Sequence, residues 1–383
     1  MRIDRRLYVG LCLLLVLLPL LTLPAHAGEA EEAVTMPPAY RELEDCIPPE
    51  ISELLPDGLF SEDAESALQA AQSLSDWEYL LNTVLSAIGL RLDEAVGLLC
   101  TLIGLILVAA VMGKLKEGIG GGSGELFGFC LRLALYTAIA LQTVSVVETV
   151  QTFFSQLSAL TGGMLPVMGV LYALGGNLGQ AAVTEEVLLV FLVVCEYVSA
   201  TVTPPVCAVC MSFSLMDAFG LRLSLSPLCA AVKRWYTSLL GLVMFLLSLA
   251  LSVQSVLVGR ADTLGMKGIK YAVGNMLPVV GGAVAGTLGT LSAGVSLLRG
   301  VAGVSGILLV ALLLLPTLTH LLLLRATVNL GSTVASLLGC DGEARLLGEM
   351  ASLQGYLAAA VSICSVTFIL ALSLLVHSTV ALT

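Results

Sequence analysis

Long runs of apolar residues dominate the chain from about residue 95 onward. Such runs approach or exceed the roughly 20 residues that a helix needs to cross the hydrocarbon core of a bilayer. Two of them, 157–177 and 272–297, are rich in Gly and contain Pro, and we interpret them as broken or re-entrant helices. The pattern predicts an all-α polytopic membrane protein with about seven spans and two broken helices. The seven runs read as spans are 95–112, 126–147, 187–203, 205–222, 236–257, 302–324 and 355–376.

The first 90 residues follow a different pattern. Three arginines near the start precede an apolar stretch that ends at Ala25-His26-Ala27, which predicts a signal peptide over 1–27, with a retained anchor as the alternative. Residues 28–60 are rich in Glu and Pro, and we expect an extended exported segment there. Over 61–90, with Ser61 as N-cap, the spacing predicts an exported amphipathic helix that docks on a partner surface. Its apolar stripe is Leu68, Ala71, Leu74, Leu81, Leu85 and Ile88.

The composition agrees with a membrane environment. Apolar residues make up 57% of the chain and charged residues 12%, and the mean hydropathy is +0.99. The net charge of −11 comes mainly from residues 28–90, which hold fourteen of the 28 carboxylates against one base, Arg41. An acidic exported segment argues against nucleic acid as a partner and favours cations or a basic protein surface.

Basic residues orient the first spans. Lys114 and Lys116 follow the first apolar run, which places this end in the cytoplasm and agrees with an exported start. Residues 91–150 then form the first two transmembrane helices. Further along, basic residues flank the 236–257 run on both sides, so the side of the C-terminus stays open.

A short motif occurs twice and suggests a duplicated core, with one membrane repeat over 151–260 and another over 261–383. The segment 162–169 (GGMLPVMG) returns at 274–281 (GNMLPVVG), with six of eight positions identical. Paired helix breaks in two halves of a membrane protein indicate a central pathway, although kinked packing helices without a conduit explain them equally well. The pathway or helix-break candidates are Gly162, Met164, Pro166, Gly169, Gly274, Met276, Pro278 and Gly281.

Polar residues inside apolar runs form a second group of candidates. An unpaired charge in a bilayer is costly, so each such side chain faces protein or water. Asp217 and Arg222 can form an ion pair, which is either structural or part of a pathway. The intramembrane polar candidates are Arg132, Glu196, Asp217, Arg222 and Asn329, the last of which matches Asp217 in the repeat register.

We find no pattern typical of catalysis. Cys207 and Cys210 have redox or metal-site spacing but lie in an apolar stretch without a partner pair, and His320 and His377 stand alone on apolar runs. We therefore predict no enzyme activity and no catalytic, cofactor or metal site.

Several segments together resemble the stage III sporulation protein AE family of endospore-forming Firmicutes. The resemblance extends over roughly 160–376 and is clearest at Leu277–Gly281, in the apolar run reaching Pro316 and in the closing span Tyr356–Leu375. It implies a mother-cell membrane protein of the complex that joins mother cell and forespore, a channel encoded beside an ATPase with secretion-system likeness. It also implies other membrane subunits of that complex as partners, and it supplies no catalytic residues.

Two functions therefore stand as hypotheses. The first is a structural and conduit subunit of the sporulation complex, in contact with other membrane subunits, the lipid bilayer or further copies of itself. The second is a stand-alone secondary transporter or permease with a site between Met164–Pro166 and Met276–Pro278.

Overall fold

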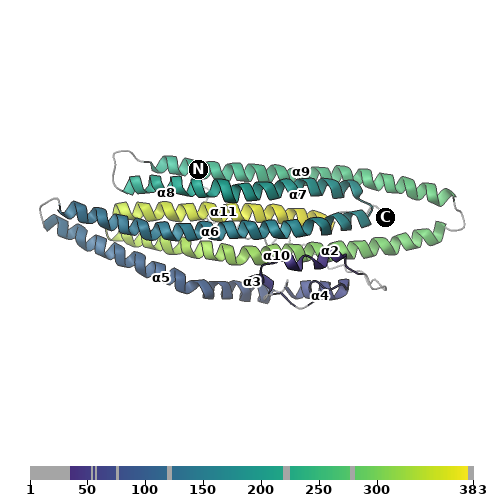
Figure 1. Ribbon diagram of the computed structural model, residues 1–383, viewed down its shortest axis with the longest axis horizontal. Helices are drawn as coiled ribbons and strands as arrows, with labels where there is room; N and C mark the ends of the chain where they lie inside the picture. Colours follow the sequence, from purple (N-terminus) through teal and green to yellow (C-terminus); the bar gives the residue numbers. More distant parts are fainter. Residues whose placement is uncertain are drawn as a thin grey trace.

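The computed structural model is a bundle of long α-helices (Figure 1). It describes residues 35–52, 55–56, 58–74, 77–118, 123–218, 225–276 and 281–377, so the predicted signal peptide lies outside the described residues. Helices α7 and α8 are joined without interruption by a short π-helix, η2. The long elements are α5 (Trp77–Gly118), α6 (Ser123–Leu174), α7 (Leu178–Tyr197), η2 (Val198–Val202), α8 (Thr203–Ala218), α9 (Ser226–Met276), α10 (Gly281–Leu337) and α11 (Asp341–His377).

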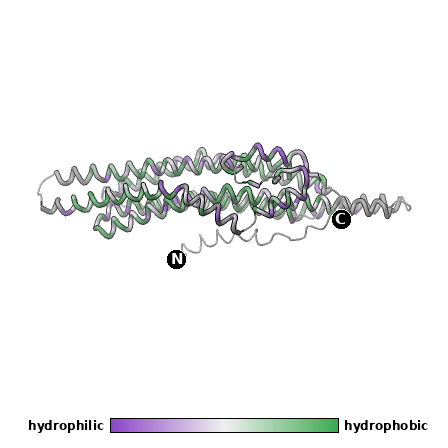
Figure 2. Tube along the Cα trace, turned by 90° about the horizontal axis from the view of Figure 1, so that it is seen from below, coloured by the Kyte–Doolittle hydropathy of each residue, from purple (hydrophilic) through white to green (hydrophobic). Residues whose placement is uncertain are grey.

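Helices α10 and α11 form the centre of the bundle. They pack against each other, α10 also packs against α5 and α6, and α11 also packs against α6, α8 and α9. Most side chains from Val301 to Leu314 are buried, as are those along one side of α11. Hydrophobic residues recur along most of the length of the bundle (Figure 2). An apolar core of this length explains why the helices stay together over many turns.

Six helical stretches within the described residues are long and apolar enough to cross a membrane. The all-α polytopic membrane fold is thus confirmed, while about seven spans were predicted. The predicted runs 187–203 and 205–222 lie in one continuous stretch through η2, which accounts for the difference between seven and six. The six stretches are Arg91–Lys114, Arg132–Leu174, Leu178–Asp217, Ser226–Val253, Ala293–Leu337 and Asp341–His377.

The predicted helix break over 157–177 is absent, because α6 continues through Pro166. Proline removes one backbone donor. The neighbouring Met164, Val167 and Met168 are buried, and their packing holds the helix on both sides of the exposed proline. The second predicted break differs in kind: α9 ends at Met276 and α10 begins at Gly281, while Pro278 lies outside the described residues.

The acidic segment is more ordered than expected. Its described part forms the short helices α2 (Pro38–Arg41), η1 (Glu44–Cys46) and α3 (Pro49–Ser52), where we predicted extended chain. Too few apolar residues are present for a core of its own, but those that exist are buried against α6 and α10. A segment with few apolar residues can thus fold against the core of its neighbours.

The predicted amphipathic helix is divided. Helix α4 (Ala64–Leu74) buries Ala71 and Leu74 of the predicted stripe, whereas Leu85 belongs to α5 and is exposed. The N-cap is Asp63 rather than Ser61, because the Asp63 carboxylate accepts a hydrogen bond from the Ser66 backbone N–H. The hydrogen bonds from Ser66 lower the pKa of this carboxyl below its usual value.

Candidate functional site

The N-terminal segment, residues 35–74, docks on the middle of the bundle through Tyr40. This side chain is fully buried, and its hydroxyl oxygen lies within hydrogen-bond distance of the Ser305 Oγ of α10, at 2.8 Å, and of the Leu59 carbonyl oxygen, at 3.0 Å. Burial raises the pKa of Tyr40 to about 12, so the phenol is neutral at physiological pH. The contact joins the acidic segment to the apolar centre of α10.

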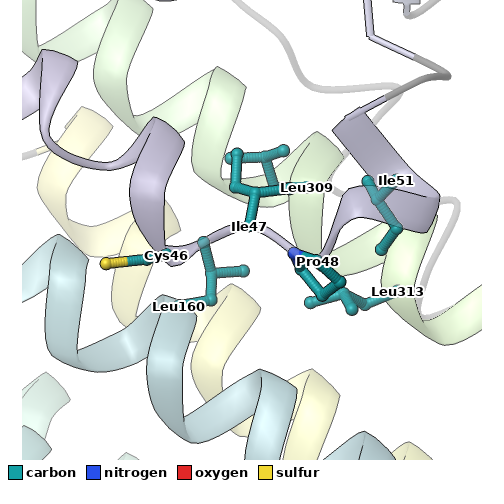
Figure 3. A pocket seen from close by; sticks show the side chains of 7 residues that line it. All are labelled: Cys46, Ile47, Pro48, Ile51, Leu160, Leu309 and Leu313. Carbon is teal, nitrogen blue, oxygen red and sulfur yellow. The ribbon is translucent and has the colours of Figure 1, made fainter.

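A second contact between the segment and the bundle is apolar. Figure 3 shows Ile47, Pro48 and Ile51 of the segment in a pocket with Leu309 and Leu313 of α10 and Leu160 of α6. Nearby, Gly163 of α6 leaves room for Cys46: a Cβ at this position would lie 2.8 Å from the Cys46 Sγ. The docked segment therefore depends on a glycine of the first motif copy for close approach.

Replacing Gly163 by leucine is expected to release the segment. The added side chain would overlap Cys46, at a cost of about 1–3 kcal/mol for overpacking. This raises the undocked fraction roughly 5- to 100-fold, measured as the rate of protease cleavage between residues 35 and 60. Gly162→Leu is the matched control, because nothing lies within 4 Å of a Cβ at Gly162. Equal cleavage rates in the two variants would contradict this docking geometry.

Among the described residues, η2 is a place where the regular α-helical backbone changes to a π-helix. Pro204 and Pro205 follow it and lack backbone donors, which leaves carbonyls of the preceding turn without helical partners. Gln151 Nε2 of α6 supplies a donor to the Ser199 carbonyl at 3.4 Å. The Val198 carbonyl accepts from the Thr203 backbone N–H and also from the Thr203 Oγ1 at 2.8 Å. The Thr203 hydroxyl also pairs with the Tyr236 hydroxyl of α9 at 3.0 Å. The irregular backbone at η2 is thus stabilised by side chains of α6 and α9.

The bundle also buries a charged cluster that we did not predict. Lys233 of α9 is almost fully buried, and its Nζ lies 2.6 Å from Glu349 Oε2 of α11. The other Glu349 oxygen accepts a hydrogen bond from the Ser226 hydroxyl at 2.9 Å, and the Lys233 ammonium stands 5.9 Å from the centre of the Tyr356 ring. Each of the two charges has a partner of opposite sign, so the ion pair connects α9 with α11 and has a structural role.

A buried arginine caps the end of α6. Arg299 of α10 donates from Nε to the Leu171 carbonyl at 3.1 Å and from a terminal nitrogen to the Tyr172 carbonyl at 3.3 Å. These carbonyls belong to the last turn of α6, where the helix dipole favours a cation. Gly175 makes this possible, because a Cβ there would overlap the guanidinium.

The two motif copies occupy different positions. Met164 is buried in the interior of α6, against Gly306 of α10, while Met276 ends α9, close in sequence to Gly281 at the start of α10. From Gly281 to Gly306 helix α10 rises by roughly 37 Å at 1.5 Å per residue. The structure therefore does not bring the copies together. Gly162 and Gly169 adjoin open space, and Gly274 lies in the last turns of α9.

The predicted intramembrane polar residues also lie in different parts of the structure. Arg132 forms an ion pair with Glu343 of α11, with Nε and Oε1 3.0 Å apart. Asp217 accepts a hydrogen bond from the Leu225 backbone N–H at 3.2 Å, while Arg222 lies outside the described residues. Glu196 and Asn329 are exposed. Among the residues that the structure describes, no group of three or more His, Cys, Asp or Glu side chains could hold a metal ion.

Comparison with known proteins gives one match. The family model for stage III sporulation protein AE matches residues 62–379, which is most of the chain. No match was found among curated proteins or among solved structures. The matched region includes all six candidate spans, the η2 break and the Lys233–Glu349 cluster. This chain is a member of the stage III sporulation protein AE family.

Proposed function

We propose that this protein is a non-enzymatic membrane subunit of the channel or secretion complex between mother cell and forespore, required during endospore formation for late forespore development. In this proposal it resides in the mother-cell membrane, and its N-terminal segment faces the intermembrane space. Other membrane subunits, the bilayer and further copies of the chain are its partners, and nucleic acid is not. The family gives the sporulation role.

Two exposed carboxylates carry the proposal that the protein works inside an assembly. Glu148 of α6 and Glu196 of α7 are exposed, well inside the candidate spans Arg132–Leu174 and Leu178–Asp217. They lie on either side of the contact between Gln151 and Ser199. A carboxylate that faces hydrocarbon costs several kcal/mol. A side of the bundle with two of them is suited to a polar or basic surface of another membrane subunit.

A stand-alone transporter has less support. Its site was expected between the two motif copies, which lie roughly 37 Å apart along α10. Solute uptake by the purified protein alone in liposomes would nevertheless favour it over the subunit proposal.

The carboxylates provide the test. In sporulating cells, the double variant Glu148→Gln/Glu196→Gln is expected to reduce co-purification with the partner subunits at least tenfold, and spore yield with it, because each amide loses a charge-assisted contact. Glu185→Gln/Glu186→Gln is the matched control, since these exposed carboxylates lie near the start of α7. Unchanged co-purification of the first variant would contradict the proposal, because an amide facing lipid alone is less costly than a carboxylate.

A further inference from the structure

Two opposite edges of the bundle expose apolar side chains. On α5 the exposed stretch lies between Arg91 and Lys114, and on α9 it lies between Arg234 and Arg260. Both have the length of a membrane span and both end at charged residues, so each is suited to lipid. The exposed side chains are Leu92, Val96, Leu107, Val108 and Val111 on α5, and Trp235, Leu239, Leu242, Phe245, Leu246, Leu249, Val253 and Leu257 on α9.

The two stretches lie at different levels along the bundle. On α5, the middle of the stretch is marked by Leu102, which lies against Gly331 of α10. On α9, Gly241 lies closest to Ile363 of α11. The middle of the α9 stretch lies beyond Gly241, toward the level at which Leu372 of α11 lies against Gly306 of α10. It therefore falls near residue 310 of α10. About twenty residues of α10 separate the two levels, which is roughly 30 Å at 1.5 Å per residue.

Charged groups occupy the complementary positions. At the level of the α9 stretch, the opposite edge carries the docked N-terminal segment, where the Arg41 and Glu62 side chains are 70% and 75% exposed. Near the level of the α5 stretch, α9 carries the exposed Arg234 on the other edge, and Arg345 of α11 is exposed as well. A membrane perpendicular to the bundle axis would immerse one of these charged sets in hydrocarbon, at several kcal/mol per charge.

We propose that the bilayer crosses this bundle obliquely, so that lipid hydrocarbon contacts the α5 stretch on one edge and the α9 stretch on the other. Helices α9, α11, α10 and α5 pack in succession, and three interaxial steps of 8–10 Å make the bundle roughly 27 Å wide between α9 and α5. The two lipid-facing stretches are offset by roughly 30 Å along the bundle axis across this width. The bundle axis is therefore tilted by about 45° from the membrane normal, well beyond the average of about 20° for transmembrane helices.

The lengths of the three longest candidate spans agree with the same tilt. The candidate spans on α6, on α7 with α8, and on α10 have 43, 40 and 45 residues, about twice what an upright span needs. At about 45° they cover roughly 42–48 Å along the membrane normal, close to the 40–45 Å of a bilayer with its headgroups.

The oblique orientation also determines which parts of the chain face the cytoplasm and which face outward. Lys114, Arg234 and Arg345 lie together in the cytoplasm, and the acidic segment lies outside. Six crossings return the chain to the side on which the first span began, so the end of α11 lies outside as well. Glu148 and Glu196 lie on α6 and α7, between the two lipid-facing edges, on the side assigned above to a protein partner.

Site-specific depth measurements test this arrangement. Nitroxide labels are attached at Val108→Cys, Leu249→Cys and Glu62→Cys in the full chain, reconstituted in phospholipid vesicles, with Cys100, Cys130 and any other reactive cysteine replaced. Val108 and Leu249 lie about 30 residues of α10 apart in level, roughly 45 Å. An upright hydrocarbon core of about 30 Å cannot hold both.

The oblique membrane predicts that the labels at 108 and 249 are both accessible to oxygen and protected from a water-soluble nickel complex, while the label at 62 shows the reverse. Exposure of either 108 or 249 to the nickel complex would overturn the proposal in favour of an upright bundle, and protection of 62 would overturn it as well. Polarised infrared spectra of the unlabelled protein in oriented bilayers are expected to give a mean helix tilt near 45°. A mean tilt near 20° would contradict the proposal.

Discussion

Replacing Lys233 by methionine is expected to destabilise the bundle by about 3–5 kcal/mol, because the change leaves the Glu349 carboxylate buried without its partner. The Lys233 side chain is 2% exposed and that of Glu349 is 23% exposed, so little water is present to compensate. The measurement is the denaturation midpoint of the purified protein in detergent. The change also removes the ammonium from its place near the Tyr356 ring.

Two controls separate the buried charge from lost packing. The double variant Lys233→Met/Glu349→Met is expected to recover most of the lost stability, because two apolar side chains can replace a buried ion pair at little cost. Arg41→Met breaks the exposed Arg41–Glu62 pair, whose Nη1 and Oε1 lie 3.1 Å apart, and is expected to cost less than about 1 kcal/mol. If Lys233→Met behaved like Arg41→Met, the cluster would not be buried as described.

Hydropathy predicted the helical membrane fold, because long apolar runs leave few other structures possible in lipid. It could not predict where one span ends and the next begins. The 187–203 and 205–222 runs are separated in the sequence by Pro204, which we took as a boundary. In the fold, Thr203, Gln151 and Tyr236 support the backbone around the prolines, and the helix continues through a π turn.

Proline alone therefore does not predict a break. Pro166 leaves α6 continuous, whereas Pro204 and Pro205 follow a π-helix, and the difference lies in the neighbouring packing rather than in the residue type. The motif containing Pro166 was singled out for its breaks, yet its Gly163 matters for the close approach of Cys46. This role cannot be predicted without knowing where Cys46 lies in the fold, and Cys46 is more than 100 residues away in the sequence.

The buried charges were missed for a related reason. Lys233 and Glu349 are 116 residues apart, and no spacing rule connects them. Arg299 caps a helix that ends 125 residues earlier in the chain. Sequence periodicity reports which face of a helix is buried, but partners across helices depend on the packing order, which a single sequence does not give. A lone base between two apolar runs, such as Arg299 between 272–297 and 302–324, is the signal that the sequence offers.

Gly303→Leu is expected to cost about 3 kcal/mol, because α10 and α11 approach closely at this position. A Cβ at Gly303 would overlap the Val376 side chain and stand 3.4 Å from the Leu372 carbonyl oxygen. Because Val376 is β-branched and the Leu372 carbonyl already lies in contact beside it, the leucine side chain displaces Val376 and weakens the packing of α11 on α10. The denaturation midpoint in detergent measures the loss.

Gly300→Leu, one turn earlier on the same helix, is the matched control. Nothing lies within 4 Å of a Cβ at Gly300, so this substitution is expected to leave stability unchanged or to raise it by up to about 1 kcal/mol through the better helix propensity of leucine. The same substitution should therefore have opposite effects at two positions of one helix. A loss of similar size at both positions would mean that the side chain itself, and not the α10–α11 contact, causes it.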